Sequence, residues 1–359
     1  MLTNLAVTKL LVVATLAFAL AFMFTPVVMR FLFKHKFGKR LRDVKEAPIF
    51  HRLHAKKLGL PTMGGLVVWI PVLALALGLH ALSIWLPETW GVTRIFARVD
   101  FLSRSQTWLP LGALVASALV GVVDDYLNVR GIGAHGGGLR ARHRLAIYTA
   151  IAFVGAWWFT FKLEWQILHV PFLGDLSVGF WSLFIFAVII VATSFSTNQT
   201  DGLDGLAGGV LLTSFGAYGV IALIIGREDL AALCAAIVGA LLAFLWFNIP
   251  PARFMMGDTG SMSLGVTLGI IAMLTNQPLL LPVIGFVFVV EMLSSIIQMA
   301  SKKLRDKKIF LSSPLHHHLE AIGWPEPKIV MRAWIVSMVM AALGVALAVL
   351  DVNLGVGLL

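Results

Sequence analysis

Long apolar runs separated by short polar segments dominate the pattern of hydrophobic and polar positions along the chain. A helix that crosses the hydrocarbon core of a membrane needs roughly 20 mostly apolar residues, with about 17 as a lower limit. Runs of about this length recur along the whole chain, so we predict an all-α fold with about ten transmembrane helices in a single domain, 1–359. The predicted spans are 10–29, 66–86, 107–123, 145–161, 178–195, 207–225, 230–247, 261–275, 278–300 and 330–350.

The composition supports this interpretation. Of the 359 residues, 59% are hydrophobic and 13% are charged, and the mean hydropathy is +0.90. Soluble domains contain roughly 25% charged residues. A soluble globular enzyme, a disordered protein and a secreted disulfide scaffold are therefore excluded, the last also because the chain has a single cysteine, Cys234.

The first apolar run is predicted to be a retained span rather than a cleaved signal peptide. It is longer than the apolar part of a typical signal peptide and lacks a basic segment before it. Basic residues follow it instead, at Arg30, Lys34 and Lys36.

The basic residues are distributed unevenly between the loops. Ten spans make nine loops, which alternate between the two sides of the membrane, and most of the 28 Lys and Arg residues lie in or beside the odd-numbered loops. Cytoplasmic loops carry the excess of Lys and Arg, so we expect the odd-numbered loops in the cytoplasm and both termini outside. The basic residues expected on the opposite side are Lys9, Arg94, Arg98, Arg104, Lys162 and Arg227.

Polar motifs that are far apart in the sequence fall in these same odd-numbered loops. We therefore expect one composite active site on the cytoplasmic face. Its segments are about 30–65, 124–144, 196–206, 248–261 and 301–329.

Aspartates recur at the predicted ends of spans, at Asp124, Asp125, Asp201, Asp204 and Asp258. Each alone is compatible with a solvated loop or a helix cap, and Asp258 before Thr-Gly-Ser suits an N-cap. A charged side chain inside a membrane costs roughly 3 kcal/mol. Several aspartates together on one face therefore favour a shared cation. Oxygen ligands select Mg²⁺ or Mn²⁺, and Mg²⁺ commonly combines one or two carboxylates with substrate phosphates. The pattern therefore indicates metal-assisted phosphoryl transfer.

For the other polar residues, a structural and a functional interpretation both stay open. Three consecutive histidines, 316–318, cannot all point in one direction, so they form either an exposed polar loop or a group that binds phosphate or tunes protonation. The basic loop 30–57 is explained mostly by orientation and by attraction to anionic membrane lipids. Lys57 is the exception, as a candidate phosphate contact, and Gln298 lies near enough to the cytoplasmic end of its span to reach the site.

Taken together, the motifs resemble the polyprenyl-phosphate N-acetylhexosamine-1-phosphate transferases. Within that superfamily, His-x-x-Lys-x-Gly-x-Pro-Thr-Met-Gly-Gly (54–65) and the histidine triplet followed by Gly-Trp-Pro-Glu-Pro-Lys (323–328) are similar to the phospho-N-acetylmuramoyl-pentapeptide transferase family. The resemblance runs from about Glu46 to Trp334. The motifs shared with the whole superfamily are Asp-Asp-Tyr (124–126), Asn-x-Thr-Asp-Gly-Leu-Asp-Gly-Leu-Ala (198–207), Phe-Asn (247–248), Met-Gly-Asp-x-Gly-Ser (256–261) and Pro-Leu-His-His-His (314–318).

The resemblance implies transfer of phospho-MurNAc-pentapeptide from UDP-MurNAc-pentapeptide to undecaprenyl phosphate, with Mg²⁺, in the bacterial inner membrane. The products are lipid I and UMP, and this is the first membrane step of peptidoglycan synthesis. By the same resemblance Asp258 is the metal ligand, Asp124 and Asp125 activate the lipid phosphate, and His317 and His318 lie near the phosphates. The implied substrate-binding residues are Lys57, Thr62, Asn198, Asp201, Asp204, Asn248, Met255, Gln298 and His316.

The sequence departs from the family pattern at four positions. Leu60, Gln199 and Asn128 replace residues common in the family. Met255 stands where the family usually has a phenylalanine that stacks on uracil, and Phe254 is displaced by one position. A thioether is a weaker stacking partner than an aromatic ring, so we expect altered nucleotide affinity or a shifted local register.

Two other functions stay open at this point. A related undecaprenyl-phosphate GlcNAc-1-phosphate transferase would share most of the motifs. A secondary transporter would instead place its acids near the bilayer midplane on broken helices, whereas these acids are predicted at one face. We expect no nucleic-acid partner, and the family resemblance implies a homodimer.

Overall fold

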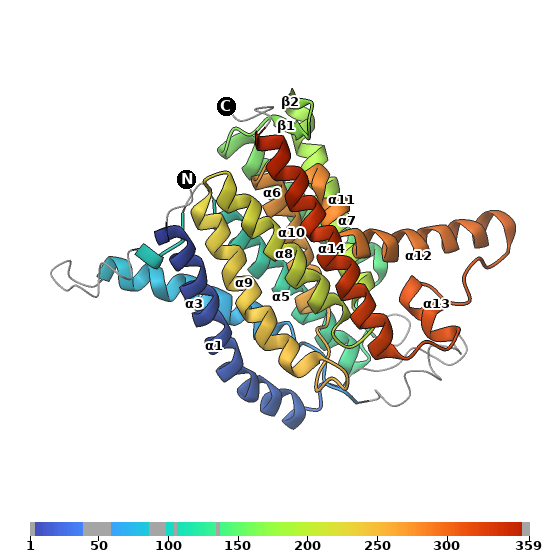
Figure 1. Cartoon of the computed structure of the whole chain (residues 1–359). Helices are drawn as coiled ribbons and strands as arrows, with labels where there is room; N and C mark the ends of the chain where they lie inside the picture. The colour runs from blue at the N-terminus through green and yellow to red at the C-terminus, as the bar shows by residue number, and fades with distance from the viewer. Residues whose placement is uncertain (1–3, 39–58, 86–97, 104–105, 134–136, 354–359) are drawn as a thin grey trace.

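The computed structural model describes residues 4–38, 59–85, 98–103, 106–133 and 137–353. It is a bundle of long helices with a two-stranded hairpin at one end (Figure 1). The principal helices are α1 (Asn4–Lys34), α3 (Leu66–Trp85), α5 (Trp108–Arg130), α6 (Ala141–Trp157), α7 (Ser182–Thr200), α8 (Leu206–Ile224), α9 (Glu228–Asn248), α10 (Asp258–Leu274), α12 (Phe286–Arg305), α13 (Leu315–Ala321) and α14 (Glu326–Asn353).

Short elements connect them. A π-helical turn, η2 (Trp158–Lys162), continues α6, and the hairpin pairs β1 (Ile167–Val170) with β2 (Gly174–Ser177). Single 3-10 turns, η3 (Gly179–Trp181) and η4 (Pro278–Leu280), precede α7 and the short α11 (Leu281–Ile284).

The structure confirms a mainly helical, polytopic membrane fold. Eight of the helices in the described ranges are long and apolar enough to cross a membrane. The predicted span 278–300 is instead a bent pair, in which η4 and α11 meet α12 at 83°. The predicted span 261–275 corresponds to α10, which has only 17 residues. The exact number of ten spans and the outside location of the termini stay predictions.

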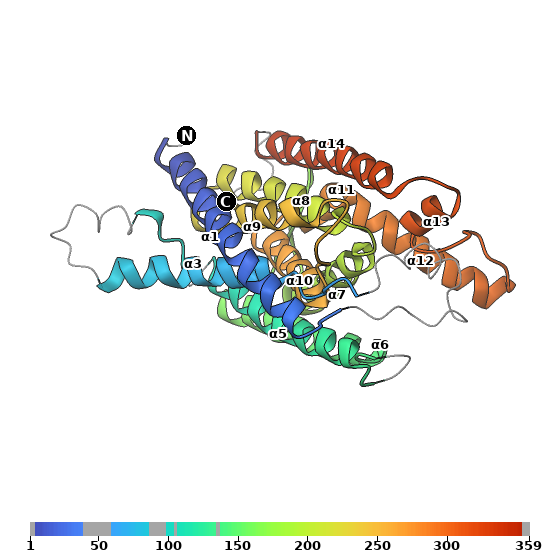
Figure 2. The ribbon, with the colours of Figure 1, turned by 90° about the horizontal axis from the view of Figure 1, so that it is seen from below.

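The bend before α12 occurs at Gly285, whose N–H donates to the carbonyl of Leu281 at 2.8 Å. Glycine is a common position for sharp helix kinks. Beyond it α12 leaves the bundle and projects sideways, and α13 lies below it toward the start of α14 (Figures 1 and 2).

The short helix α10 lies in the middle of the bundle. All its residues from Thr259 to Leu274 are buried, and it packs mainly against α5 and α7. Since neighbouring helices rather than lipid surround it, α10 does not need the length of a full span. Its N-terminus begins inside protein, and the candidate site is built around that end.

Helix α5 extends beyond its predicted end at residue 123. It continues to Arg130 and stops at Gly131, which has a φ of +69°. Asp124 and Asp125 therefore lie within the last turns of a helix and are buried there, with exposed fractions of 5% and 7%. The prediction that they lie at the end of this span is confirmed, although the helix continues for five residues beyond Asp125.

The hairpin was not predicted from the sequence. It lies at the opposite end of the bundle from α13 (Figure 1) and is fastened to α14 by His169 on β1. The imidazole Nδ1 lies 2.6 Å from an oxygen of Asp175, and Nε2 lies 2.5 Å from an oxygen of Asp351 near the end of α14. Asp351 also accepts the N–H of Phe172 at 2.7 Å.

Candidate active site

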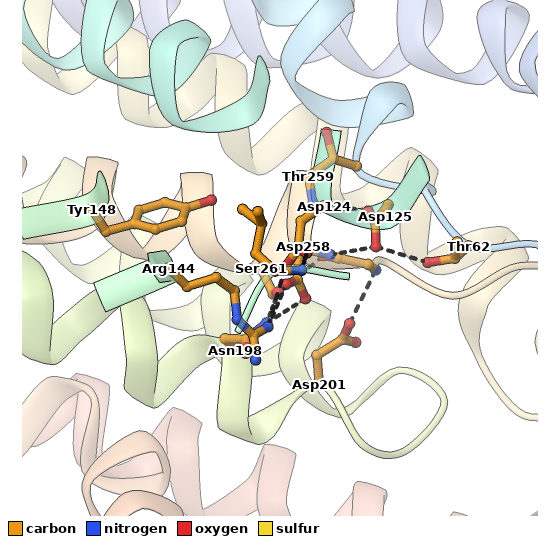
Figure 3. Close-up of polar contacts among 12 residues, drawn as sticks. Thr62, Asp124, Asp125, Arg144, Tyr148, Asn198, Asp201, Asp258, Thr259 and Ser261 are labelled. Atoms are coloured by element: carbon orange, nitrogen blue, oxygen red, sulfur yellow. Dashed lines mark hydrogen bonds and ion pairs between the residues drawn. The ribbon is translucent and has the colours of Figure 1, made fainter. Parts of the chain in front are cut away.

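The N-terminus of α10 is capped by a side chain from another helix. The two carboxylate oxygens of Asp125 accept the backbone N–H groups of Asp258 at 3.2 Å and Thr259 at 3.1 Å (Figure 3). The hydroxyl of Thr62 donates to the same carboxylate at 3.4 Å. The first N–H groups of a helix have no partner within it and favour a negative charge. The N-cap alternative for Asp258 is therefore wrong: Asp258 is the first helical residue, and Asp125 supplies the cap.

The residue before the helix, Gly257, allows this close approach. Its φ is +74°, and a Cβ atom there would lie 2.5 Å from Oδ2 of Asp125 and 2.7 Å from Oγ1 of Thr62. Its N–H donates to Asp201 at 3.1 Å. Only glycine can adopt this left-handed backbone and also fit where there is no room for a Cβ atom. Asp125, Asp201 and Gly257 together therefore fix the position of Asp258.

Two aspartates from different helices converge on one cation. Nη1 of Arg144, in the first turn of α6, lies 2.7 Å from Oδ2 of Asp258 and 3.4 Å from Oδ2 of Asp124. The other oxygen of Asp258 accepts a hydrogen bond from Asn198 at 2.8 Å. The other oxygen of Asp124 accepts the N–H of Leu139 at 2.5 Å. Figure 3 shows these side chains pointing toward one another.

This donor set fits a hard divalent cation. The converging atoms are carboxylate oxygens, which suit Mg²⁺ or Mn²⁺, and a guanidinium already places positive charge between them. Asp258 and Asp124 are the residues that would hold the ion. Within the described ranges no three His, Cys, Asp or Glu side chains are grouped closely enough to hold a metal ion by themselves.

The histidine helix α13 meets the turn that follows α7. A Cβ atom added to Gly202 would collide with the imidazole of His316. His316 is held from its other side by Glu291 of α12, whose Oε2 lies 2.9 Å from Nδ1. The 198–205 turn and the triplet 316–318 are thus in contact, as the single-face prediction requires.

Comparison with known proteins gives the same assignment. Residues 107–276 match the family described as glycosyl transferase family 4. The chain is 38% identical to the phospho-N-acetylmuramoyl-pentapeptide-transferase of Chloroflexus aggregans, over 94% of this chain and 90% of that protein. It is 39% identical to the enzymes of that name from Shouchella clausii and Anoxybacillus flavithermus, in each case over 95% of this chain and 98% of the other.

The chain belongs to the phospho-N-acetylmuramoyl-pentapeptide-transferase family. It is therefore a membrane-bound phosphosugar transferase, as the motifs predicted. The family match 107–276 contains Asp124, Asp125 and Asp258, together with the turn after α7.

Several predicted binding residues of this transferase hold the backbone of the site. Oδ1 of Asn248 accepts the N–H of Gly205 at 3.0 Å, and its Nδ2 donates to the carbonyl of Phe254 at 2.7 Å. Asp204 accepts the N–H of Ala252 at 3.0 Å, while its own N–H donates to Glu326 at 2.7 Å. These contacts join the end of α9 to the turn after α7 and to the start of α14.

Gln298 has a similar structural part in α12. Its Oε1 accepts the N–H groups of Ile309 and Phe310, both at 3.0 Å, and its Nε2 donates to the carbonyl of Phe310 at 2.9 Å. The side chain therefore fastens the loop after α12. Its hydrogen bonds are with this loop rather than with the aspartate cluster.

The three histidines point to three different partners, as the sequence analysis expected. His316 pairs with Glu291, His317 Nδ1 lies 2.7 Å from Glu320, and Nδ1 of His318 accepts the N–H of Leu311 at 3.2 Å. Nε2 of His316 is buried without a hydrogen-bond partner in the described structure. The phosphate role of His317 and His318 stays a prediction.

Met255 is held through its backbone. Its N–H donates to Pro61 and its carbonyl accepts from Gly64, both at 2.8 Å. Phe254 is 1% exposed and packs between Phe244 and Phe247, so it does not present a face for stacking. Lys57 lies outside the described residues.

The sequence analysis did not single out Arg144. It was counted only as one basic residue of an odd-numbered loop. A usable signal was present, because Arg144 begins the span that follows the Asp-Asp pair, where a charge must find a partner. That its partners include Asp258, 114 residues away, required the fold.

Proposed function

We propose that this transferase moves phospho-MurNAc-pentapeptide from UDP-MurNAc-pentapeptide to undecaprenyl phosphate. An oxygen of the lipid phosphate attacks the sugar-linked phosphorus of the donor, a new P–O bond forms, and the P–O bond to UMP breaks. UMP leaves with the bonding electrons, and the lipid product is lipid I. This is the first membrane step of peptidoglycan synthesis.

The observation that carries the proposal is the meeting of Asp124 and Asp258 around one cationic group at the buried end of α10. It occurs in a chain that aligns over nearly its whole length with proteins bearing this enzyme's name. Phosphoryl transfer depends mainly on positioning and charge stabilisation rather than on covalent chemistry by the protein. A rigidly held pair of carboxylates beside an arginine suits that requirement.

Each residue then has a distinct part. Asp258, with Asp124, would hold Mg²⁺, which would neutralise charge on the phosphate oxygens. Arg144 supplies a fixed positive charge beside the reacting phosphates, and Asn198 orients the carboxylate of Asp258. Asp125 positions Asp258 through the helix cap, so its effect on lipid-phosphate activation is indirect. The histidines of α13 contribute on the side of the donor phosphates.

We further propose that the site faces the cytoplasm of a bacterial inner membrane, with both termini outside. The uneven distribution of basic residues supports this orientation. The proposed homodimer has no support beyond family resemblance, and the mass of the protein–detergent complex tests it.

The function is tested with purified protein in detergent, Mg²⁺, undecaprenyl phosphate and either UDP-MurNAc-pentapeptide or UDP-GlcNAc. We expect release of UMP with the first donor only. Release with UDP-GlcNAc would assign the GlcNAc-1-phosphate activity instead. Failure with both donors, in protein that remains folded, would contradict the proposed substrates.

A further inference from the structure

A polar cavity lies at the end of the bundle opposite the aspartate cluster. Its volume is about 780 Å³, within the range typical of small-molecule sites. The walls come from the end of α6 and η2, the segment leading into β1, and the residue before α9. Because α6 carries Arg144 at its other end, and α9 carries Asn248 at its other end, the cavity and the active site lie at opposite ends of these two helices.

The cavity contains a cation without a carboxylate partner. The guanidinium of Arg227 lies 4.6 Å from the centre of the Trp165 ring. No hydrogen bond or ion pair joins its side chain to another described residue, whereas the nearby acid Asp229 is already paired with Lys9 at 2.8 Å. Burial lowers the pKa of Arg227, which is the sign of a charge kept partly from water without compensation.

The indole of Trp165 presents a second unsatisfied group. Its Nε1 is buried and has no hydrogen-bond partner in the described structure. An unpaired buried donor is unfavourable, so a ligand that accepts from it gains that contact. Arg227 and Trp165 together offer donors to a single anionic group such as a phosphate.

A carboxylate lies in the wall of the same cavity. Glu164 is exposed, lines the cavity and has no hydrogen bond or ion pair with a described residue. Its φ is +53°, in the left-handed region that disfavours residues with a side chain. Such strain persists where the surroundings impose it and is common at binding sites. Among the described residues, the cavity therefore combines a cation and an anion that are not paired with opposite charges.

The position of the cavity points to a lipid. It lies where the span formed by α6 with η2 ends and where α9 begins, both long enough to cross a membrane, which is the level of the headgroups. Exposed apolar side chains of Phe161 and Ile167 form part of its wall. A ligand with charged and apolar parts matches this environment better than a free ion does.

We propose that this cavity binds the headgroup of a zwitterionic phospholipid with a primary amine, with its phosphate at Arg227 and Trp165 and its ammonium group at Glu164. The acyl chains extend along Phe161 and Ile167 into the membrane. The site is independent of the transferase reaction and lies at the other end of the bundle.

The test is titration of the purified full-length protein in detergent, followed by native mass spectrometry, with three probes. These are short-chain phosphatidylethanolamine, phosphatidylglycerol and inorganic phosphate. We expect phosphatidylethanolamine to bind about tenfold more tightly than phosphatidylglycerol, the effect of one charged hydrogen bond. Equal or tighter binding of phosphatidylglycerol would overturn the zwitterionic assignment, and binding of free phosphate as tight as that of the lipid would overturn the lipid assignment.

Variants locate the site. Arg227→Gln should weaken both lipids about tenfold, and Glu164→Gln should remove the preference for the amine lipid while leaving phosphatidylglycerol unchanged. Lys162→Gln is the matched control, because Lys162 is a neighbouring cation that stacks on Trp157 and does not line the cavity. If Arg227→Gln does not fold, Arg227→Lys and Glu164→Gln are measured instead. The ratio of the phosphatidylethanolamine affinity to the phosphatidylglycerol affinity then decides the question. Equal affinities in Lys162→Gln and Arg227→Gln would reject the site.

Discussion

Each end of the bundle holds a nitrogen-containing side chain, Arg144 or His169, between two carboxylates. The two ends differ in how far these side chains are exposed to solvent. At one end the side chains of Arg144 and Asp258 are 26% and 20% exposed. At the other, which we call the closed end, the side chains of His169 and Asp351 are 3% and 2% exposed, while that of the second carboxylate, Asp175, is 26% exposed. Similar arrangements can therefore serve different purposes: a partly exposed Arg144 can exchange partners with a substrate, whereas the buried His169–Asp351 pair holds its elements together.

The hydrogen bonds support this distinction. Asp351 is occupied by the His169 ring, the N–H of Phe172 and, at 3.3 Å, the amide of Gln277. These contacts tie the hairpin and the end of α10 to α14. At the Asp258 end, the backbone contacts are made by Asp125 and Asp201 instead, which leaves Asp258 to face Arg144 and Asn198.

The largest expected effect is at Asp258. Asp258→Asn removes a charge that would hold the metal while keeping the shape and the hydrogen bond from Asn198. We expect UMP release to fall by roughly a thousandfold or more, because metal charge stabilisation contributes several kcal/mol, with unchanged thermal stability. Wild-type turnover in a folded Asp258→Asn protein would reject the metal role.

At the closed end the expected effect is on stability rather than on chemistry. His169→Ala leaves the buried carboxylate of Asp351 without its partner, and we expect a loss of about 3 kcal/mol in unfolding free energy. Chemical denaturation in detergent measures it. Turnover per folded molecule should stay within twofold of wild type, roughly the scatter of distant independent sites; a large loss of turnover would mean that the two ends are coupled.

Arg144 sharpens the comparison, because its replacement is expected to affect both the metal site and the stability of the fold. Arg144→Gln leaves Asp124 and Asp258 facing each other. We therefore expect the free energy of unfolding to fall by about 1–2 kcal/mol without divalent ions and to recover when Mg²⁺ is added. Melting temperatures with and without Mg²⁺ measure this. The control is Arg142→Gln, an exposed arginine two residues earlier, which should show no Mg²⁺-dependent recovery; an identical response of the two variants would argue against the shared cation position.

The smallest expected effect is at Met255. Met255→Phe restores the aromatic residue that the family resemblance implies, and we expect uridine-nucleotide affinity to rise by up to about threefold or stay unchanged, as for a weak aromatic contact. Equilibrium binding of UMP measures it. A sharp loss of affinity would show that the register assumed around residues 254–258 is wrong.

The sequence predicted most of the residues that form the site, but not the role of each. Asp124, Asp125, Asn198, Asp201 and Asp258 were all assigned to one site, and they form one hydrogen-bonded cluster. Spacing and residue type could not distinguish the carboxylates that face the cation from those that hold the backbone. That division depends on the direction of each side chain, which differs even between two neighbouring residues of one helix.

The opposite end of the bundle was predicted least well. His169 carried no motif, and Asp351 was not among the predicted site residues. Their pairing joins residues 182 positions apart, and no local pattern encodes such a contact. The cavity beside Arg227 was missed for the same reason, since its walls come from two separate segments.

The sequence by itself determined the membrane fold, most of the helical spans and the family, because apolar run length and short motifs are local properties that lipid and ligand chemistry constrain directly. Only the tertiary structure decided that Asp125 caps the helix of Asp258, that Arg144 bridges two aspartates and that α12 bends away from the bundle. The physical reason is that these features depend on the close approach of buried polar groups from different helices, where each must find a partner that the chain order does not specify.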